Sequence, residues 1–175
     1  MEIAGIDFRS FYNYGIDADY FAEIFTTSGL ILNENVKWIT FHGSYDFAYL
    51  VKVLNNEILP EDENEFNHLI SLYFPTFYDV RQLIKNSSWI KGSLSRIAND
   101  LNIRIIGNCH QAGSDSLVTS KVYFKLLNDF GEQVDLLNDQ NKLFGFTYTM
   151  IEDLDYNYHM SLGGISGKNF FYNII

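Results

Sequence analysis

Two aspartates in this sequence stand between an apolar or loop segment and a stretch with helical periodicity. Asp46 lies in "FHGSYDFAYLVKVL", which follows the apolar run "VKWITF", and Asp115 lies in "HQAGSDS", separated from His110 by four residues that include Gly113. Carboxylate oxygens are the ligands that Mg²⁺ prefers, and an imidazole can accept a proton near neutral pH. Two divalent ions about 4 Å apart can clamp the attacking water and the leaving oxygen of a phosphodiester. The residue types therefore indicate metal-dependent hydrolysis, which needs more carboxylates than these two.

Each of these residues also has an ordinary structural interpretation. A carboxylate in the first turn of a helix is stabilised by backbone N–H groups and by the helix dipole, so Asp46 could simply satisfy a helix start. His42, just before it, is more often a packed strand-end residue than a substrate contact. A turn followed by an N-cap accounts equally well for Ser114 and Asp115. On the functional interpretation, Gly113 lets that loop turn tightly and brings imidazole and carboxylate together.

Helices that alternate with short extended segments must position these residues. The periodicity predicts helices over residues 17–29, 44–54, 59–74, 92–101 and 110–130, a strand over 36–42, a short strand over 102–106, and an extended piece that passes into a helix over 76–86. Asp17 and Ser44 are predicted N-caps, and Gly29 is a predicted C-terminal stop. This alternation favours an α/β architecture with helical crossover connections. Residues 131–175 lose the periodicity, so no element is predicted there.

Two apolar stripes and one further acid complete the structural predictions. The stripes are most simply core, and they comprise Phe21, Ile24 and Phe25 in one helix and Phe66, Leu69, Ile70 and Phe74 in another. The segment "VKWITFH" is apolar enough to be a central strand covered on both faces. Asp79, in "FYDV", is interpreted as a structural acid at a helix start.

Composition limits the class of protein. A chain of 175 residues with 47% hydrophobic content is expected to form one domain. Its net charge of −10 excludes nucleic-acid binding through a general basic surface, although a metal-mediated contact escapes that objection. Cys109 is the single cysteine, which excludes an intrachain disulfide and fits a reducing compartment. Without an apolar signal region or a run of about 18 apolar residues, we expect a soluble intracellular protein with no membrane partner.

Several long blocks of the sequence resemble one enzyme family in the same order. "GIDADYFAEIFTTSGLIL", "VKWITFHGSYDFAYLVKVL", "YFPTFYDVRQLIK" and "HQAGSDSLVTSKVYFKLL" are similar to the Caf/Pop deadenylase family, the poly(A)-specific ribonuclease catalytic subunit of the Ccr-Not complex. The resemblance implies an α/β, ribonuclease H-like DEDD exonuclease fold of the histidine-bearing type over residues 1–146. Residues 147–175 would be a C-terminal tail of unknown structure.

The resemblance also implies a function and a set of site residues. The implied enzyme is a 3′-to-5′ exoribonuclease that shortens mRNA poly(A) tails, releasing AMP, with two divalent ions, Mg²⁺ or Mn²⁺. Asp46 in "SYDF" matches the third acid of the family, and Asp115 in "HQAGSD" matches the fourth; both are implied metal ligands. His110 matches the histidine that deprotonates the attacking water. The order of Gly43 and Ser44 is a small departure from the family pattern.

One departure from the family is large. Its first two acids form an Asp-x-Glu pair in a "DTEFPG"-like block, and nothing in residues 1–45 matches that block. Asp17 and Asp19 align to a later helix, so they do not replace the pair. The fold is therefore expected to be incomplete at the N-terminus, which leaves "VKWITF" with an unpaired edge. Two ions would also lack ligands, so full hydrolytic rates are not expected from this chain alone.

Three functions follow from this comparison of motifs. The first is the poly(A) exoribonuclease, with poly(A) RNA, the Ccr-Not scaffold and a second deadenylase subunit as partners, in the cytoplasm and nucleus. The second is a truncated, catalytically incomplete relative that acts as a protein-binding module of that complex. The third is another histidine-type DEDD exonuclease that trims small oligoribonucleotides or DNA. The long colinear blocks favour the first two over the third.

Overall fold

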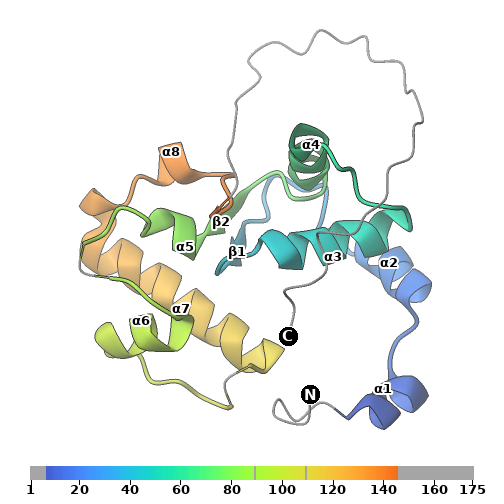
Figure 1. The fold of residues 1–175 in the computed structure, drawn as a ribbon, viewed down its shortest axis with the longest axis horizontal. Coiled ribbons are helices and arrows are strands. Elements are labelled where there is room, and N and C mark those ends of the chain that lie inside the picture. The colour runs from blue at the N-terminus through green and yellow to red at the C-terminus, as the bar shows by residue number, and fades with distance from the viewer. Residues whose placement is uncertain (1–6, 89, 109, 146–175) are drawn as a thin grey trace, which may run out of the picture.

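The chain folds into helices around a short parallel sheet. The structure is a computed structural model that describes residues 7–88, 90–108 and 110–145, so Cys109 and the expected tail over residues 147–175 lie outside the described residues. The elements are α1 (Phe8–Tyr14), α2 (Ala18–Thr27), β1 (Trp38–Thr40), α3 (Ser44–Asn55), α4 (Glu63–Tyr73), β2 (Phe77–Asp79), α5 (Val80–Leu83), α6 (Leu94–Asp100), α7 (Ala112–Phe130), η2 (Gly131–Gln133) and α8 (Leu136–Asp139). Figure 1 shows α2, α3 and α4 on one side of the sheet and α5 to α8 on the other.

The two strands pair in parallel, and helices α3 and α4 make the crossover between them. Trp38 stands opposite Phe77, and Ile39 stands opposite Tyr78. A parallel pair requires a crossover of a dozen or more residues, commonly helical, as the sequence pattern predicted. The predicted strand over residues 36–42 is confirmed only at its centre, because the described ladder extends over Trp38–Thr40.

The predicted strand over residues 102–106 is wrong. The described backbone there has no strand, because its first residues end helix α6 instead. The N–H of Asn102 donates to the carbonyl of Asn99 at 2.9 Å, and the N–H of Ile103 donates to the carbonyl of Ala98 at 2.7 Å. Asn102 takes a left-handed φ of 54°, as residues that close a helix often do. Backbone groups used in this way are not free to join a sheet.

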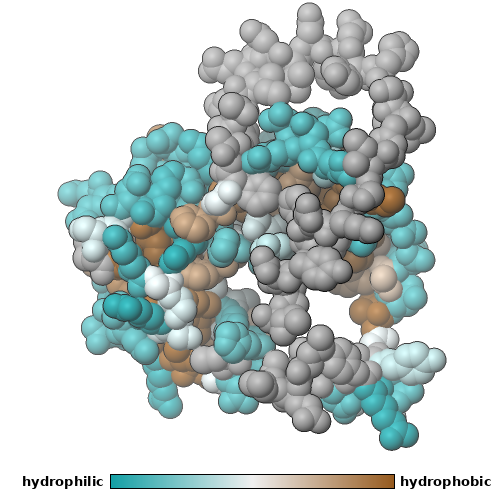
Figure 2. Space-filling view, viewed as in Figure 1, coloured by the Kyte–Doolittle hydropathy of each residue, from teal (hydrophilic) through white to brown (hydrophobic). Residues whose placement is uncertain are grey.

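Two apolar clusters cover the two faces of the sheet, because successive strand side chains point to opposite faces. Phe77 belongs to the cluster beneath α3 and α4, with Trp38 packed against it. Tyr78 belongs to the cluster formed with α5, α6 and α7, with Ile39 packed against that one. The predicted cover on both faces of β1 is therefore confirmed, but within the described residues β1 pairs with β2 alone, so the prediction of a central strand is wrong there. The space-filling view shows hydrophilic side chains over α4 at the top and hydrophobic ones on the left, at the level of α5 and α7 (Figure 2).

The predicted core stripes have different outcomes. In α4, Phe66 and Ile70 are buried and Leu69 is partly buried, and the stripe continues to the buried Phe74, so this prediction is confirmed. In α2 the prediction is confirmed only in part: Phe25 is partly buried and packs against the cluster that contains Phe77, whereas the helix has no fully buried residue and Ile24 is 44% exposed. The helix lies at the margin of the molecule and packs on one side against α3.

The helix starts follow local chemistry in most cases. Asp17 caps α2 as predicted, accepting the N–H groups of Asp19 and Tyr20. Ser44 is not an N-cap, which corrects the sequence prediction: it is the first residue of α3, and Gly43 precedes it without a side-chain cap. A long-range contact explains this start and is described with the site below. None of the described helices has both the length and the apolar character that crossing a bilayer requires.

Candidate active site

Asp46 lies in the first turn of α3, just beyond the carboxyl end of β1. Its side chain reaches solvent, yet its surroundings raise its pKa above the ordinary value of 3.8. Desolvation is the largest cause, and a backbone hydrogen bond of Asp46 itself opposes it. The negative charge of Asp79 raises the pKa further, whereas His42 lowers it. Asp46 is thus a partly desolvated carboxylate at a strand end, which is a place suited to a cation.

Asp79 lies completely buried at the end of β2 and accepts four backbone hydrogen bonds. Oxygen Oδ1 accepts the N–H of His42 at 2.7 Å and that of Arg81 at 2.9 Å. Oxygen Oδ2 accepts the N–H of Gly43 at 3.3 Å and that of Phe144 at 3.0 Å. The interpretation of Asp79 as a structural helix-start acid is confirmed. The bonds to residues 42, 43 and 144 were not predictable from the neighbouring sequence.

The turn between β1 and α3 is tightly constrained. His42 has a left-handed φ of 60°, and its ring meets that of Phe144 edge-on with 5.4 Å between centroids. A Cβ added to Gly43 would lie 2.5 Å from the Cβ and 2.8 Å from the Cγ2 of Thr40, so a glycine is required for this approach. The Arg81 guanidinium lies 5.2 Å from the centre of the Phe144 ring.

The second predicted group lies at the start of α7. Asp115 is half-buried in the first turn of this helix, and His110 is exposed just before it, with a left-handed φ of 64°. The hydroxyl of Ser114 donates to the carbonyl of Ile106 at 2.8 Å, which ties the preceding loop to the helix. The predicted role of Gly113 is wrong, because that residue lies inside the helix.

The sharp turn before α7 uses a different glycine. Gly107 has a φ of 90°, and a Cβ there would lie 3.2 Å from the side chain of Ser114. Gln111, rather than Ser114 or Asp115, occupies the N-cap position of α7, and it makes no side-chain cap. The alternative in which Ser114 or Asp115 caps the helix is therefore wrong as well.

Asp46 and the pair formed by His110 and Asp115 both lie on helices next to β1, but the described residues do not form one site from them. Helix α3 follows β1 directly and α7 packs against it. The charged neighbours that shift the pKa of Asp46 are Asp79 and His42, whereas Asp115 and His110 sit together at the start of α7. Among the residues that the structure describes, no three His, Cys, Asp or Glu side chains gather closely enough to hold a metal ion. The two aspartates have the right donor chemistry for Mg²⁺ or Mn²⁺ and fit part of a ligand set.

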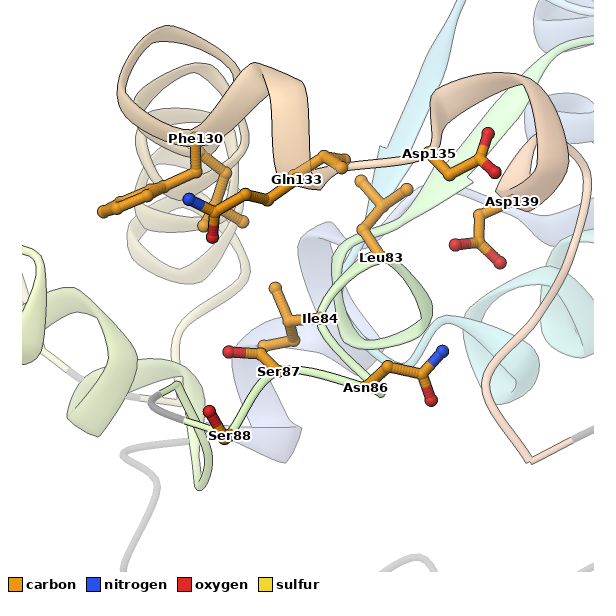
Figure 3. A pocket seen from close by; sticks show the side chains of 11 residues that line it. Leu83, Ile84, Asn86, Ser87, Ser88, Phe130, Gln133, Asp135 and Asp139 are labelled. Atoms are coloured by element: carbon orange, nitrogen blue, oxygen red, sulfur yellow. The ribbon is translucent and has the colours of Figure 1, made fainter.

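A cavity of about 260 Å³ lies at the other end of α7, between that helix, α5, η2 and α8 (Figure 3). Asp139 lines it and accepts hydrogen bonds from Lys85 Nζ and Gln82 Nε2, both at 2.9 Å. Phe130, the last residue of α7, lines the cavity, and the rise of an α-helix places it about 22 Å from Asp115 along the axis of α7. The cavity is therefore separate from the Asp115 end of α7, and its buried acid is already paired.

Comparisons of sequence agree on one family. A family model described as CAF1 family ribonuclease matches residues 21–123. A probable CCR4-associated factor 1 homolog 7 from Arabidopsis thaliana is 47% identical over 127 residues, which cover 73% of this chain and 46% of that protein. The poly(A) ribonuclease pop2 of Schizosaccharomyces pombe is 40% identical over 146 residues, which cover 83% of this chain and 44% of that protein. The chain thus spans about half the length of these relatives.

Comparisons of structure agree with those of sequence. The structure of S. pombe Pop2p in its Mg²⁺ and Mn²⁺ bound form matches with a TM-score of 0.78 and 39% identity, covering 83% of this chain and 57% of that one. A structure of the yeast NOT1 MIF4G domain co-crystallized with CAF1 matches with a TM-score of 0.69 and 28% identity, covering 80% of this chain and 58% of that one. The fold is accordingly the ribonuclease H-like α/β fold that the motifs implied.

Proposed function

The chain belongs to the CAF1 family of ribonucleases, and from this premise we propose that it is a 3′-to-5′ exoribonuclease that shortens mRNA poly(A) tails and releases AMP. One observation supports the proposal most strongly: Asp46, His110 and Asp115 all lie within the matched residues 21–123. The two acids also begin helices that adjoin the same strand. The poly(A) ribonuclease pop2 of S. pombe supplies the substrate class.

Three side chains have assigned roles in this proposal. Asp46 and Asp115 would hold Mg²⁺ or Mn²⁺, the ions named for the S. pombe structure. When bound, such ions stabilise the charge that develops on the oxygens of a phosphodiester during hydrolysis. His110, exposed at the start of α7, would accept the proton of the attacking water near neutral pH. An acidic protein of net charge −10 would thereby hold RNA through cations rather than through a basic surface.

The activity is tested with the purified chain and a 5′-labelled oligoadenylate in Mg²⁺ or Mn²⁺. We expect slow, metal-dependent release of AMP that the Asp115→Asn substitution abolishes. Asp100→Asn is the matched control, because Asp100 is an exposed acid at the end of α6 and is not one of the proposed ligands. The proposal is wrong if neither this chain nor a longer version that carries an Asp-x-Glu strand releases nucleotide in Mg²⁺ or in Mn²⁺.

A second function is favoured by the incomplete set of ligands. In the described ranges no three metal-binding side chains gather, and β1 is hydrogen-bonded to β2 alone. On this proposal the chain is a truncated, catalytically incomplete relative that binds other subunits of the Ccr-Not complex. Its signature is complex formation without tail shortening by the 175-residue chain. Tight binding of two Mn²⁺ ions in calorimetry would count against it.

The partners proposed for both functions are the same. The yeast relative CAF1 was co-crystallized with the NOT1 MIF4G domain, which supports the Ccr-Not scaffold as a partner. A second deadenylase subunit as a partner, and the cytoplasm and nucleus as locations, are proposed from the motif resemblance.

The third function, another histidine-type DEDD exonuclease, is distinguished by initial rates on matched RNA and DNA homopolymers. An enzyme that trims DNA or any short oligoribonucleotide would show no preference for oligoadenylate.

A further inference from the structure

One buried carboxylate connects the turn before Asp46 to a distant segment of the chain. We propose that Asp79 is a positioning residue for Asp46, because it holds the His42–Gly43 turn and thereby sets where the Asp46 carboxylate meets a cation. The inference rests on the proposed function, since it assumes that Asp46 is a metal ligand. It adds a residue to the site that makes no contact with substrate.

The hydrogen bonds of Asp79 exceed what a helix start requires. A cap needs only a bond to the beginning of its own helix, and the N–H of Arg81 provides it at 2.9 Å. The other three donors are the N–H groups of His42, Gly43 and Phe144, which are 37, 36 and 65 residues away in the sequence. Hydrogen bonds to an ionised carboxylate are about twice as strong as neutral ones. Asp79 therefore holds three segments at one point.

The turn needs such an anchor because its backbone is unfavourable. His42 has a φ of 60°, a conformation that a residue other than glycine keeps only when its surroundings enforce it. Gly43 is pressed against Thr40 so closely that a Cβ has no room. Both N–H groups of this turn donate to the same carboxylate, one to each oxygen. The conformation and the anchor thus occur at the same two residues.

The turn is connected directly to the first turn of α3. The carbonyl of Gly43 accepts the N–H of Phe47 at 3.0 Å, which is the bond that begins the helix. Asp46 lies between these two residues, in that first turn. A displacement of Gly43 therefore displaces Asp46.

Two substitutions of Asp79 distinguish the effect of its hydrogen bonds on the turn from the effect of its negative charge. In Asp79→Asn one oxygen becomes an NH₂ group, which faces two N–H donors and cannot accept from them. Asp79→Glu keeps the charge but adds a methylene at a completely buried position, so the oxygens must move. Both variants release the turn, whereas only the first removes a negative charge. Asp139→Asn is the matched control, because Asp139 is also a buried, hydrogen-bonded acid, but it accepts from the side chains of Lys85 and Gln82 and not from the His42–Gly43 turn.

The experiment measures Mn²⁺ affinity and amide exchange on the 175-residue chain. Paramagnetic broadening in NMR spectra gives the affinity even when binding is weak, and hydrogen exchange reports on the amides of His42, Gly43 and Phe144. We expect both Asp79 variants to lose about 10- to 100-fold in Mn²⁺ affinity, the usual effect of removing a group that orients a metal ligand. The three amides should exchange faster, and Asp139→Asn should change neither measurement.

Other outcomes overturn the inference in different ways. A loss of affinity in Asp79→Asn alone would show that charge, rather than position, is responsible. Unchanged affinity in both variants would reject the positioning role and leave the proposed function intact. If the unsubstituted chain binds no Mn²⁺, both the proposed metal site and the positioning role are wrong.

A further pair of variants serves if position 79 does not tolerate substitution. His42 is exposed, and asparagine tolerates the left-handed conformation that glycine leaves unrestrained. We expect His42→Gly to lower Mn²⁺ affinity several-fold relative to His42→Asn, because both remove the imidazole and only the first loosens the turn. Equal affinities in the two variants would contradict the proposal.

Discussion

At the scale of single residues, the proposed metal ligand Asp46 carries a cost in stability. The folded protein raises its pKa above 3.8, mainly by desolvation and also through the charge of Asp79. The folded state therefore binds this proton more tightly than the unfolded state does. The loss of stability that the Asp46 charge causes is absent below the pKa of Asp46 in the unfolded chain, and it grows as the pH rises through the pKa of Asp46 in the folded protein.

This sign leads to a prediction for Asp46→Asn. Above the folded pKa the variant should be more stable than the unsubstituted chain, because it lacks a desolvated charge. Below pH 3.8 the two should have equal stability, since both side chains are then neutral. Urea unfolding at a series of pH values checks this difference. A variant that is less stable at neutral pH would show that the charge of Asp46 has a favourable partner in the fold.

A pair of glycine substitutions tests the constraint on the turn before α3. Gly43→Ala should lower the free energy of unfolding by about 1–3 kcal/mol, because the new Cβ overlaps the side chain of Thr40. Gly113→Ala is the matched control: its Cβ meets nothing within 4 Å, and alanine favours the helix by up to about 1 kcal/mol. Urea unfolding of both variants gives the comparison. Equal effects at the two sites would mean that the turn relaxes easily.

At the scale of elements, a side-chain hydrogen bond ties the start of α7 to the loop before it. Ser114→Ala removes the hydrogen bond to the carbonyl of Ile106, which should cost about 1 kcal/mol of stability. Ser116→Ala is the control, since that exposed hydroxyl only returns to the carbonyl of Gly113 in its own helix. Chemical denaturation measures both. If the two variants lose the same stability, the loop before α7 is held by other contacts.

The helices also show how position in the fold changes the use of an apolar stripe. The stripe of α4 is buried, whereas the equivalent stripe of α2 stays partly exposed. Phe25 packs edge-on against Trp38 at 5.9 Å, and Phe21 stacks on Phe25 at 5.1 Å. The periodicity is alike in both helices, but α4 contributes the buried Phe66 and Ile70 to the cluster that contains Phe77, whereas α2 contributes no fully buried residue. A similar sequence pattern thus contributes buried core residues in α4 and only partly buried residues in α2.

At the scale of the whole molecule, the two edges of the sheet differ. Asn141 closes the outer side of β2: it accepts the N–H of Phe77 at 2.9 Å and donates its own N–H to the Phe77 carbonyl at 3.0 Å. Within the described residues β1 pairs only with β2. An open strand edge favours pairing with another chain, and edge lysines oppose that pairing.

The open edge predicts self-association of the isolated chain. Lys37, exposed beside the edge of β1, should oppose this self-association. The Lys37→Thr variant should therefore begin to associate at lower protein concentrations than the unsubstituted chain. Lys91→Thr, a change of an exposed lysine in the loop before α6, is the control. Sedimentation velocity over a range of concentrations checks the shift. Monomers at every concentration in all three proteins would show that the edge is covered.

The sequence alone determined the local features of this protein. The α/β alternation, the Asp17 cap, the helix from residue 44 and the long helix that ends at Phe130 each follow from periodicity and capping within a dozen residues. The positions of Asp46 and Asp115 at helix starts follow from the same signals. These features are predictable because the groups that stabilise them are neighbours in the chain.

The tertiary structure alone decided how those features meet. The four bonds of Asp79, the need for glycine at position 43 and the failure of residues 102–106 to form a strand all depend on which backbone groups find partners. In the case of Asp79, three of those partners are between 36 and 65 residues away. A hydrogen bond of that range exists only after the sheet has brought the segments together, so no local pattern of residues encodes it.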